Sequence, residues 1–271
     1  MNKYIVFTDL DGTLLDSETY EFTAAVEAIL FLKKNRIPII PCTSKTHKEV
    51  IRLRRKLKIY DPFIVENGSA IFYPVDYFRA ASWPSAEIDD YKVRILGKSY
   101  SEIINFLHKL KSKYNLDITG FHEMDALRIA ELTNLDAADA ETAKYRYFSE
   151  PFIFNNRYDF PEEAVNDIKS EGFRLLRGNR FFHLLGNCDK GDAVREVTKM
   201  FQTLAGNNNL KTIGIGDSMN DLEMLQNVQF PVLVKKHNGR HQNGINLNNI
   251  LLTRSVGPAG WSEAVLKLVD F

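Results

Sequence analysis

The chain of 271 residues has only two cysteines, no excess of either charge and no long apolar run. Cys42 and Cys188 do not make a disulfide framework, and Cys42 stands in an apolar run that is typical of a core residue. The 35 acidic and 35 basic residues give a formal net charge of zero, which argues against a general affinity for nucleic acid or anionic membrane. No stretch is apolar for long enough to span a bilayer, and there are no internal repeats or low-complexity segments.

We expect no secretory leader, because residues 1–3 lead straight into an apolar segment that ends in acids. We therefore expect a cytoplasmic protein. We also expect a monomer or homodimer, with neither nucleic acid nor membrane as a partner. The length allows one large domain or two, with enough apolar residues for a core.

Apolar segments and helical patterns alternate along the first part of the chain. Three strands are predicted, at 4–8, 37–43 and 62–65, with helices between them at 19–35 and 46–58. The second helix opens with Thr46 and Glu49, a capping-box pair. This order predicts a doubly wound, Rossmann-like parallel sheet in an α/β fold, with helices on both faces.

The pattern changes between about Trp83 and Gly186, where helices and short strand candidates favour antiparallel pairing. We predict an inserted α+β domain at 84–186, which divides the core into 1–83 and 187–271. The core pattern then resumes with four predicted elements: a helix from Lys190, strands at 212–216 and 232–234, and a C-terminal helix from about Trp261.

The first strand ends in two aspartates, Asp9 and Asp11, followed by Gly12 and Thr13. Ligands bind at the carboxyl ends of strands in an open α/β sheet. Two carboxylates at such a place repel each other unless a cation or a shared proton relieves them. The alternative is a strand followed by an ordinary Asp-Gly turn, and this stretch alone does not decide between the two.

Three further strand or helix ends carry matching groups: Thr43 with Ser44 and Lys45, then Lys190, then Asp217 with Asp221. Carboxylates at two strand ends suit Mg²⁺. A hydroxyl and a lysine suit phosphoryl oxygens, and a carboxylate nucleophile is a route to an acyl phosphate. Each group also has a plain alternative, since Thr43 could end a strand, Lys190 lie on the surface and Asp217 cap a helix. To dismiss a site, all of these plain alternatives would have to hold at the same time.

These segments, taken in order, resemble the four motifs of the haloacid dehalogenase superfamily of phosphatases: 9–13, Thr43, Lys190 and 216–221. The inserted domain resembles the large α/β cap of that superfamily. Residues 43–46 stand where its sugar-phosphatase branch usually has Thr-Gly-Arg. Three other segments resemble the mannosyl-3-phosphoglycerate phosphatases within that branch: 65–68, 177–183 and 257–261.

The resemblance implies a role for each matched carboxylate. Asp9 would attack phosphorus, and Asp11 would protonate the leaving alkoxide and then activate water. Mg²⁺ would be held by Asp9, the backbone carbonyl of Asp11, and Asp217. Asp221 would orient the ligands from nearby.

The resemblance also implies the contacts to substrate. Thr43 and Lys190 would hold the transferred phosphoryl group. The candidates for the glycerate carboxylate and the sugar hydroxyls are Ser44, Lys45, Asn67, Arg180 and His183. Arg180 could instead be a solvated charge, and His183 a satisfied interior histidine. His237 and His241 have the spacing of a metal pair, but Gly239 between them argues against a helix, so we predict loop residues.

We predict Mg²⁺-dependent hydrolysis of mannosyl-3-phosphoglycerate to mannosylglycerate and phosphate, through an aspartyl-phosphate, in the synthesis of a compatible solute. One alternative is a phosphatase acting on the glucosyl analogue or another sugar phosphate. A second is a phosphomutase with the same core and cap. A third is a binding module that has kept the fold. That last alternative predicts loss of a core catalytic group, and none of those groups is missing from the sequence.

Overall fold

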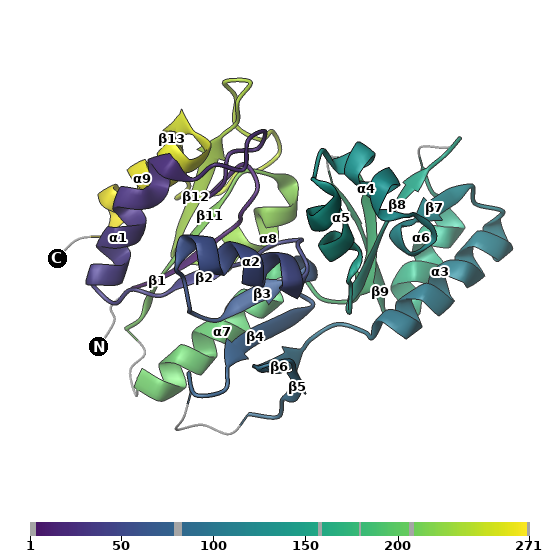
Figure 1. Ribbon diagram of the computed structural model, residues 1–271, viewed down its shortest axis with the longest axis horizontal. Helices are drawn as coiled ribbons and strands as arrows, with labels where there is room; N and C mark the ends of the chain where they lie inside the picture. Colours follow the sequence, from purple (N-terminus) through teal and green to yellow (C-terminus); the bar gives the residue numbers. More distant parts are fainter. Residues whose placement is uncertain (1–3, 79–82, 157–158, 179, 206–208, 270–271) are drawn as a thin grey trace.

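The computed structural model describes residues 4–78, 83–156, 159–178, 180–205 and 209–269. A larger α/β core and a smaller cap lie beside each other and are joined by two connections (Figure 1). Among the helices of the described ranges, none is both long enough and apolar enough to cross a membrane.

A five-stranded parallel sheet forms the centre of the core, in the order β13-β12-β11-β1-β2. Its strands are β1 (Tyr4–Thr8), β2 (Ile39–Pro41), β11 (Lys211–Gly216), β12 (Phe230–Lys235) and β13 (Leu251–Val256). At the end of β1, Thr8 lies beside Ile215 of β11 and beside Pro41 of β2. The residues that follow β1 and β11 are therefore neighbours at the carboxyl edge of the sheet.

Helices cover both faces of this sheet, and the alternation of β1 shows which helix covers which face. Val6 packs in one apolar cluster with three helices, α1 (Val26–Lys34), α2 (His47–Leu57) and α9 (Gly257–Leu268). Phe7 points to the other face and packs with α7 (Lys190–Ala205) and α8 (Leu222–Gln226). The doubly wound α/β core predicted from the sequence is confirmed.

The predicted capping box at the start of α2 is present. The Thr46 hydroxyl accepts a hydrogen bond from the Glu49 backbone N–H at 3.3 Å, and the Glu49 carboxylate accepts one from the Thr46 N–H at 2.8 Å. These bonds satisfy donors that the first turn of a helix leaves free. They fix the start of α2 three residues after Ser44, at the edge of the sheet.

A second, antiparallel sheet extends the core, in the order β3-β4-β6-β5. It contains β3 (Phe63–Val65), β4 (Ala70–Pro74), β5 (Ala86–Ile88) and β6 (Tyr91–Ile95). The predicted strand at 62–65 exists, but it meets the parallel sheet through an isolated bridge, between Cys42 and Ile64. Its main partner is β4, which lies antiparallel to it.

The cap is built on a third sheet, in the antiparallel order β7-β8-β10-β9. Its strands are β7 (Ile118–Gly120), β8 (Ser149–Phe154), β9 (Phe173–Arg177) and β10 (Phe182–Gly186). One face packs against α3 (Tyr100–Tyr114) and α6 (Glu162–Ser170), and the other against α4 (Ala126–Thr133) and α5 (Ala137–Lys144). The inserted α+β domain predicted from the sequence is present.

The boundaries of that inserted domain, 84–186, stay a prediction. Because β6 pairs with β4, residues 86–95 belong to a sheet on the core side. We therefore propose that the chain passes into the cap near Gly97 and returns after Gly186.

Candidate active site

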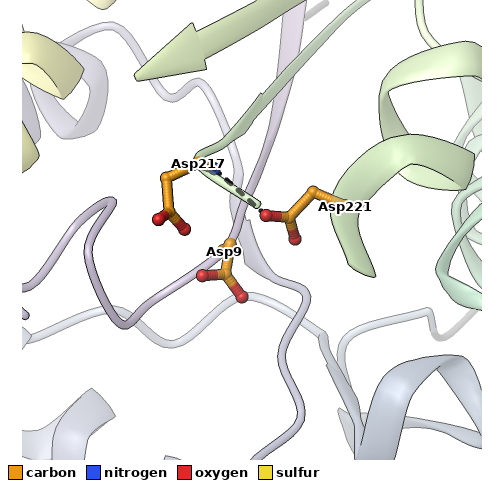
Figure 2. A group of neighbouring side chains, drawn as sticks. All are labelled: Asp9, Asp217 and Asp221. Carbon is orange, nitrogen blue, oxygen red and sulfur yellow. Dashed lines mark hydrogen bonds between the residues drawn. The ribbon is translucent and has the colours of Figure 1, made fainter. Parts of the chain in front are cut away.

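Three buried carboxylates meet at the carboxyl edge of the parallel sheet. Asp9 follows β1, Asp217 follows β11, and Asp221 lies one turn further on. One oxygen from each lies within 4.8 Å of the others, and the three side chains lie next to one another in Figure 2. Two of the four motif regions picked out in the sequence, 9–13 and 216–221, thus supply one compact cluster.

The turn after β11 is fixed by one of these carboxylates. Oδ2 of Asp221 accepts hydrogen bonds from the backbone N–H groups of Asp217 and Ser218, at 3.1 and 3.0 Å. The Asp217 bond is the dashed line in Figure 2. Asp221 therefore holds Asp217 in place with one oxygen, and its other oxygen contacts Nζ of Lys190.

Lys190 supplies a cation to the cluster. Its Nζ lies 2.8 Å from Oδ1 of Asp9 and 2.6 Å from Oδ1 of Asp221, and the side chain is 1% exposed. Lys190 is the first residue of α7, where Asp189 and Asp192 each accept a hydrogen bond from the other's backbone N–H, at 2.8 and 3.1 Å. This reciprocal capping positions the lysine at the helix start.

The loop after β3 packs closely against this helix start. Gly68 has a φ of +95°, and a Cβ atom there would lie 2.0 Å from the carbonyl oxygen of Asp189. Only glycine fits this approach and this left-handed conformation. The segment 65–68, noted in the sequence, therefore contacts the residue before Lys190.

The cluster carries more negative charge than one lysine balances. Burial raises the pKa of Asp9 well above its usual value, and the Asp221 charge raises it further. Burial, with Asp221, raises the pKa of Asp217 to about 7. Burial opposes the charge of Lys190, but Asp221 and Asp9 outweigh it and raise the lysine pKa. Buried oxygen donors with unrelieved charge fit a hard divalent cation such as Mg²⁺.

Asp11 is not one of the three clustered carboxylates, and its side chain contacts Lys45, just before the start of α2. Its Oδ2 lies 2.8 Å from Nζ of Lys45, and that lysine is also 3.8 Å from Glu49. Burial lowers the pKa of Lys45, but the negative charges of Asp11 and Glu49 raise it by more, so the pKa lies above its usual value. Within the described part of the chain, the buried Oδ1 of Asp11 has no hydrogen-bond partner. Its assignment as a metal ligand through the backbone carbonyl stays a prediction.

Thr43 and Asn67 are joined at the ends of β2 and β3. The Asn67 backbone N–H donates to the Thr43 carbonyl at 2.9 Å, and the Thr43 hydroxyl accepts from the Lys45 N–H at 3.2 Å. Both side chains are almost fully buried. The Oδ1 atom of Asn67 has no partner within the described residues and is available to a ligand.

A cavity of about 630 Å³, open to solvent, lies between core and cap. The predicted site residues that line it are Asp9, Asp11, Ser44, Lys45, Asn67, Arg180, His183 and Asp217. Apolar cap residues, Phe121 and Leu135 among them, line the same space. The cavity therefore joins the carboxylate cluster to both cap residues that were predicted to contact substrate.

The two predicted cap residues differ in character. Arg180 is exposed, and its Nη1 donates to the Thr133 carbonyl at 2.6 Å. His183 has a buried Nδ1 atom that lacks a partner within the described residues. Burial, with the nearby Arg146 charge, lowers the pKa of His183 to about 3. His183 is therefore a neutral hydrogen-bonding group at the wall of the cavity.

This neutral histidine predicts a pH effect on stability. Above its ordinary pKa of about 6.5, a histidine whose pKa is lowered in the folded state does not reduce the free energy of unfolding. Below about pH 6.5 that free energy falls steadily, because the unfolded state binds a proton that the folded state does not. Between pH 7 and pH 5 we expect His183→Gln to lose about 2 kcal/mol less unfolding free energy than the wild type. Chemical denaturation at both pH values measures this, with His241→Gln as the matched control. Equal losses in all three proteins would contradict it.

Arg146 lines the cavity but was not singled out in the sequence. Its side chain is 7% exposed, and Nη2 donates to the Ser44 carbonyl at 2.8 Å and to the Ser149 hydroxyl at 2.9 Å. The guanidinium therefore connects the cap to the end of β2. The one signal in the sequence is its position between two tyrosines, ahead of a strand.

Glu66 makes a second connection that sequence reasoning did not find. Its fully buried carboxylate accepts hydrogen bonds from the backbone N–H groups of Tyr147 and Phe148, at 3.0 and 3.1 Å. It also accepts one from the Ser149 hydroxyl at 2.8 Å. Glu66 stands beside Asn67, in a segment noted for its resemblance, and it anchors the cap rather than the ligand.

The segment 257–261, also noted in the sequence, contacts the end of β1, directly before Asp9. The fully buried indole of Trp261 donates through Nε1 to the Thr8 hydroxyl at 3.0 Å, and that hydroxyl donates to the Asp9 carbonyl at 2.6 Å.

His237 and His241 form no metal pair, because His237 bonds Asp16 at 2.6 Å and His241 bonds the Thr253 carbonyl at 3.0 Å. They lie in a loop, as predicted.

Known proteins resemble the chain over almost its whole length. Residues 6–243 match a family model described as haloacid dehalogenase-like hydrolase. A protein of Persephonella marina is 40% identical over 98% of this chain and 97% of its own length, and one of Methanococcoides burtonii is 39% identical over the same shares. Both are named glucosyl-3-phosphoglycerate/mannosyl-3-phosphoglycerate phosphatase.

A solved structure shows the same fold. The sucrose-phosphatase of Synechocystis, in complex with sucrose and phosphate, matches with a TM-score of 0.64 over 98% of both chains. Its sequence is only 14% identical. The arrangement of core and cap is therefore shared with a protein of very different sequence.

Proposed function

Because the chain belongs to the haloacid dehalogenase-like hydrolases and is a phosphoric monoester hydrolase of the glucosyl-3-phosphoglycerate/mannosyl-3-phosphoglycerate phosphatase type, we propose that it removes phosphate from mannosyl-3-phosphoglycerate with the help of Mg²⁺. The products are mannosylglycerate and inorganic phosphate. We place the reaction in the cytoplasm, in the synthesis of mannosylglycerate as a compatible solute, and the enzyme as a monomer or homodimer.

The first half of the reaction transfers the phosphoryl group to Asp9. A carboxylate oxygen of Asp9 bonds to phosphorus while the bond from phosphorus to the ester oxygen breaks. Asp11 gives a proton to the leaving alkoxide. Lys190, 2.8 Å from Asp9, and the Thr43 hydroxyl hold the phosphoryl oxygens.

The second half releases phosphate. Asp11 takes a proton from water, the water oxygen bonds to phosphorus, and the bond from phosphorus to Asp9 breaks. When bound to Asp9, Asp11 and Asp217, with Asp221 nearby, Mg²⁺ supplies positive charge that offsets the repulsion between the carboxylate and the phosphate. Closure of the cap keeps other acceptors from the acyl phosphate.

One observation carries the proposal: a buried cluster of Asp9, Asp217 and Asp221 with Lys190 adjoins, through Asp9 and Asp217, a cavity of about 630 Å³ between core and cap. This volume lies in the range of pockets that hold drug-sized ligands. The cavity wall includes two cations, Lys45 and Arg180, that suit the glycerate carboxylate. Ser44, Asn67 and the neutral His183 suit sugar hydroxyls, through hydrogen bonds that need no charge.

A panel of phosphate esters tests the substrate. With Mg²⁺ we expect phosphate release from mannosyl-3-phosphoglycerate and its glucosyl analogue with a kcat/KM at least ~10-fold above those for mannose 6-phosphate and 3-phosphoglycerate, which each lack part of the recognised structure. Chelation of Mg²⁺ should abolish the release.

Two results would contradict the proposal. Turnover of other sugar phosphates, with neither glycosyl phosphoglycerate accepted, would point to another phosphatase of the same branch. Isomerisation of a hexose 1-phosphate in the presence of a bisphosphate, without release of phosphate, would point to a phosphomutase.

A further inference from the structure

Two histidines of the cap face each other outside the catalytic cavity. His108 is exposed on α3, and His122 is partly buried in η3 (Phe121–Glu123), the turn that follows β7. Their Nε2 atoms are 3.2 Å apart. Neither ring is among the residues of the described chain that line the cavity.

A buried carboxylate fixes the ring of His122. Glu150 of β8 is fully buried and accepts hydrogen bonds from Nδ1 of His122 at 2.7 Å, from the backbone N–H of His122 at 3.0 Å and from the Tyr100 hydroxyl at 2.7 Å. A carboxylate only accepts hydrogen bonds, so the imidazole proton lies on Nδ1. The lone pair of Nε2 is therefore directed toward His108.

The backbone at Gly120 leaves room for the close approach of Glu150 and His122. A Cβ atom at Gly120 would lie 2.4 Å from Oε1 of Glu150 and 2.6 Å from Nδ1 of His122. Any side chain at position 120 would displace the carboxylate or the ring. The close approach of Glu150 and His122 thus depends on the glycine two residues before the histidine.

We propose that His108 and His122 form a binding site for a transition-metal ion of the zinc class, separate from the carboxylate cluster. Two imidazole nitrogens bound to one tetrahedral ion at 2.0–2.1 Å would lie about 3.3 Å apart, close to the 3.2 Å observed. A carboxylate behind a metal-binding histidine is the usual way to fix its tautomer and raise its basicity.

The chemistry of the two sites differs. The cluster of Asp9, Asp217 and Asp221 offers oxygen ligands, which suit Mg²⁺, whereas imidazole nitrogen suits zinc, copper and nickel. Water completes the coordination, because His108 is exposed. A bound ion joins α3 to η3, whose Phe121 lines the cavity, so the ion stiffens the cap next to the substrate.

Copper binding to the full chain tests this proposal. Mg²⁺ in large excess fills the carboxylate cluster, and one equivalent of Cu²⁺ is then added as a spectroscopic probe. We expect an electron paramagnetic resonance spectrum split by two imidazole nitrogens. Competition with Zn²⁺ should remove that spectrum, since both ions favour nitrogen ligands.

Single substitutions decide whether the pair is responsible. His108→Gln changes an exposed residue, so we expect an unaltered fold and unaltered phosphate release in Mg²⁺ alone, with Cu²⁺ affinity at least ~10-fold lower. His122→Gln should weaken binding to a similar extent, and His241→Gln should leave it unchanged. If the wild type lacks the two-nitrogen spectrum, or if His108→Gln binds Cu²⁺ with the same affinity and spectrum, the two rings share only a hydrogen bond and the proposal is wrong.

Discussion

Replacing Asp9 by asparagine is expected to lower phosphate release by at least ~10⁴-fold, because loss of a catalytic nucleophile removes a covalent step that no neighbour supplies. The carboxamide has nearly the same shape but does not attack phosphorus. The measurement is kcat for phosphate release under saturating substrate and Mg²⁺.

The same substitution should not harm the fold. Asp9 is one of three buried carboxylates, and burial together with Asp221 raises its pKa. Asparagine removes one of the mutually repelling charges, while Lys190 keeps its partner Asp221 at 2.6 Å. Without metal we therefore expect a melting temperature equal to or above that of the wild type.

A matched control separates the nucleophile from the loss of any carboxylate. Asp125 caps α4 by accepting the Arg128 N–H at 2.7 Å, and asparagine caps helices about as well as aspartate. Asp125→Asn should keep wild-type kcat. Activity of Asp9→Asn above about one hundredth of the wild type would refute the nucleophile assignment.

The part of the site that was predictable from sequence is the part that parallel topology brings together. Asp9 and Asp217 each follow an apolar strand directly, and parallel neighbours place such residues at one edge. Lys190 starts a helix whose capping acids, Asp189 and Asp192, are visible in the sequence. Local patterns thus predicted both where these side chains stand and that they meet.

Contacts between core and cap were not predictable in the same way. Glu66 bonds Tyr147 and Phe148 across 81 and 82 residues of chain, and Arg146 bonds Ser44 across 102. No local pattern encodes such pairs, because they depend on how the cap docks. The pairing of Lys45 with Asp11 is likewise set by the approach of α2 to the loop after β1.

Some elements were missed, and one was placed beside the wrong partner, because their patterns are weak or ambiguous. The apolar strand β3 has the composition of a buried parallel strand, yet its main partner is antiparallel β4, and composition does not distinguish the two. The alanine-rich α5 has only a narrow apolar face, Ala140 and Ala143, and was not predicted. The edge strand β13 is partly exposed and mixed in composition, and it was also missed.

Replacing Asp11 by asparagine should slow both halves of the reaction, by about 10²–10⁴-fold, because a carboxamide neither gives a proton to an alkoxide nor takes one from water. Substrates with different leaving groups distinguish the two halves of the reaction. An activated aryl ester such as p-nitrophenyl phosphate needs no proton to leave, so its first half should remain fast in Asp11→Asn while hydrolysis of the aspartyl-phosphate stays slow. Rapid mixing should then show a burst of nitrophenol close to one equivalent per enzyme, followed by slow turnover.

With the sugar ester the same variant should show no burst, since its alkoxide needs the proton in the first half. Asp125→Asn, as control, should match the wild type with both substrates. The fold of Asp11→Asn should persist, because the carboxylate is 39% exposed and loss of its ion pair to Lys45 leaves that lysine 3.8 Å from Glu49. A variant that keeps wild-type turnover of the sugar ester, or that shows neither a burst nor slow hydrolysis with the aryl ester, would show that the proton is handled by a residue other than Asp11.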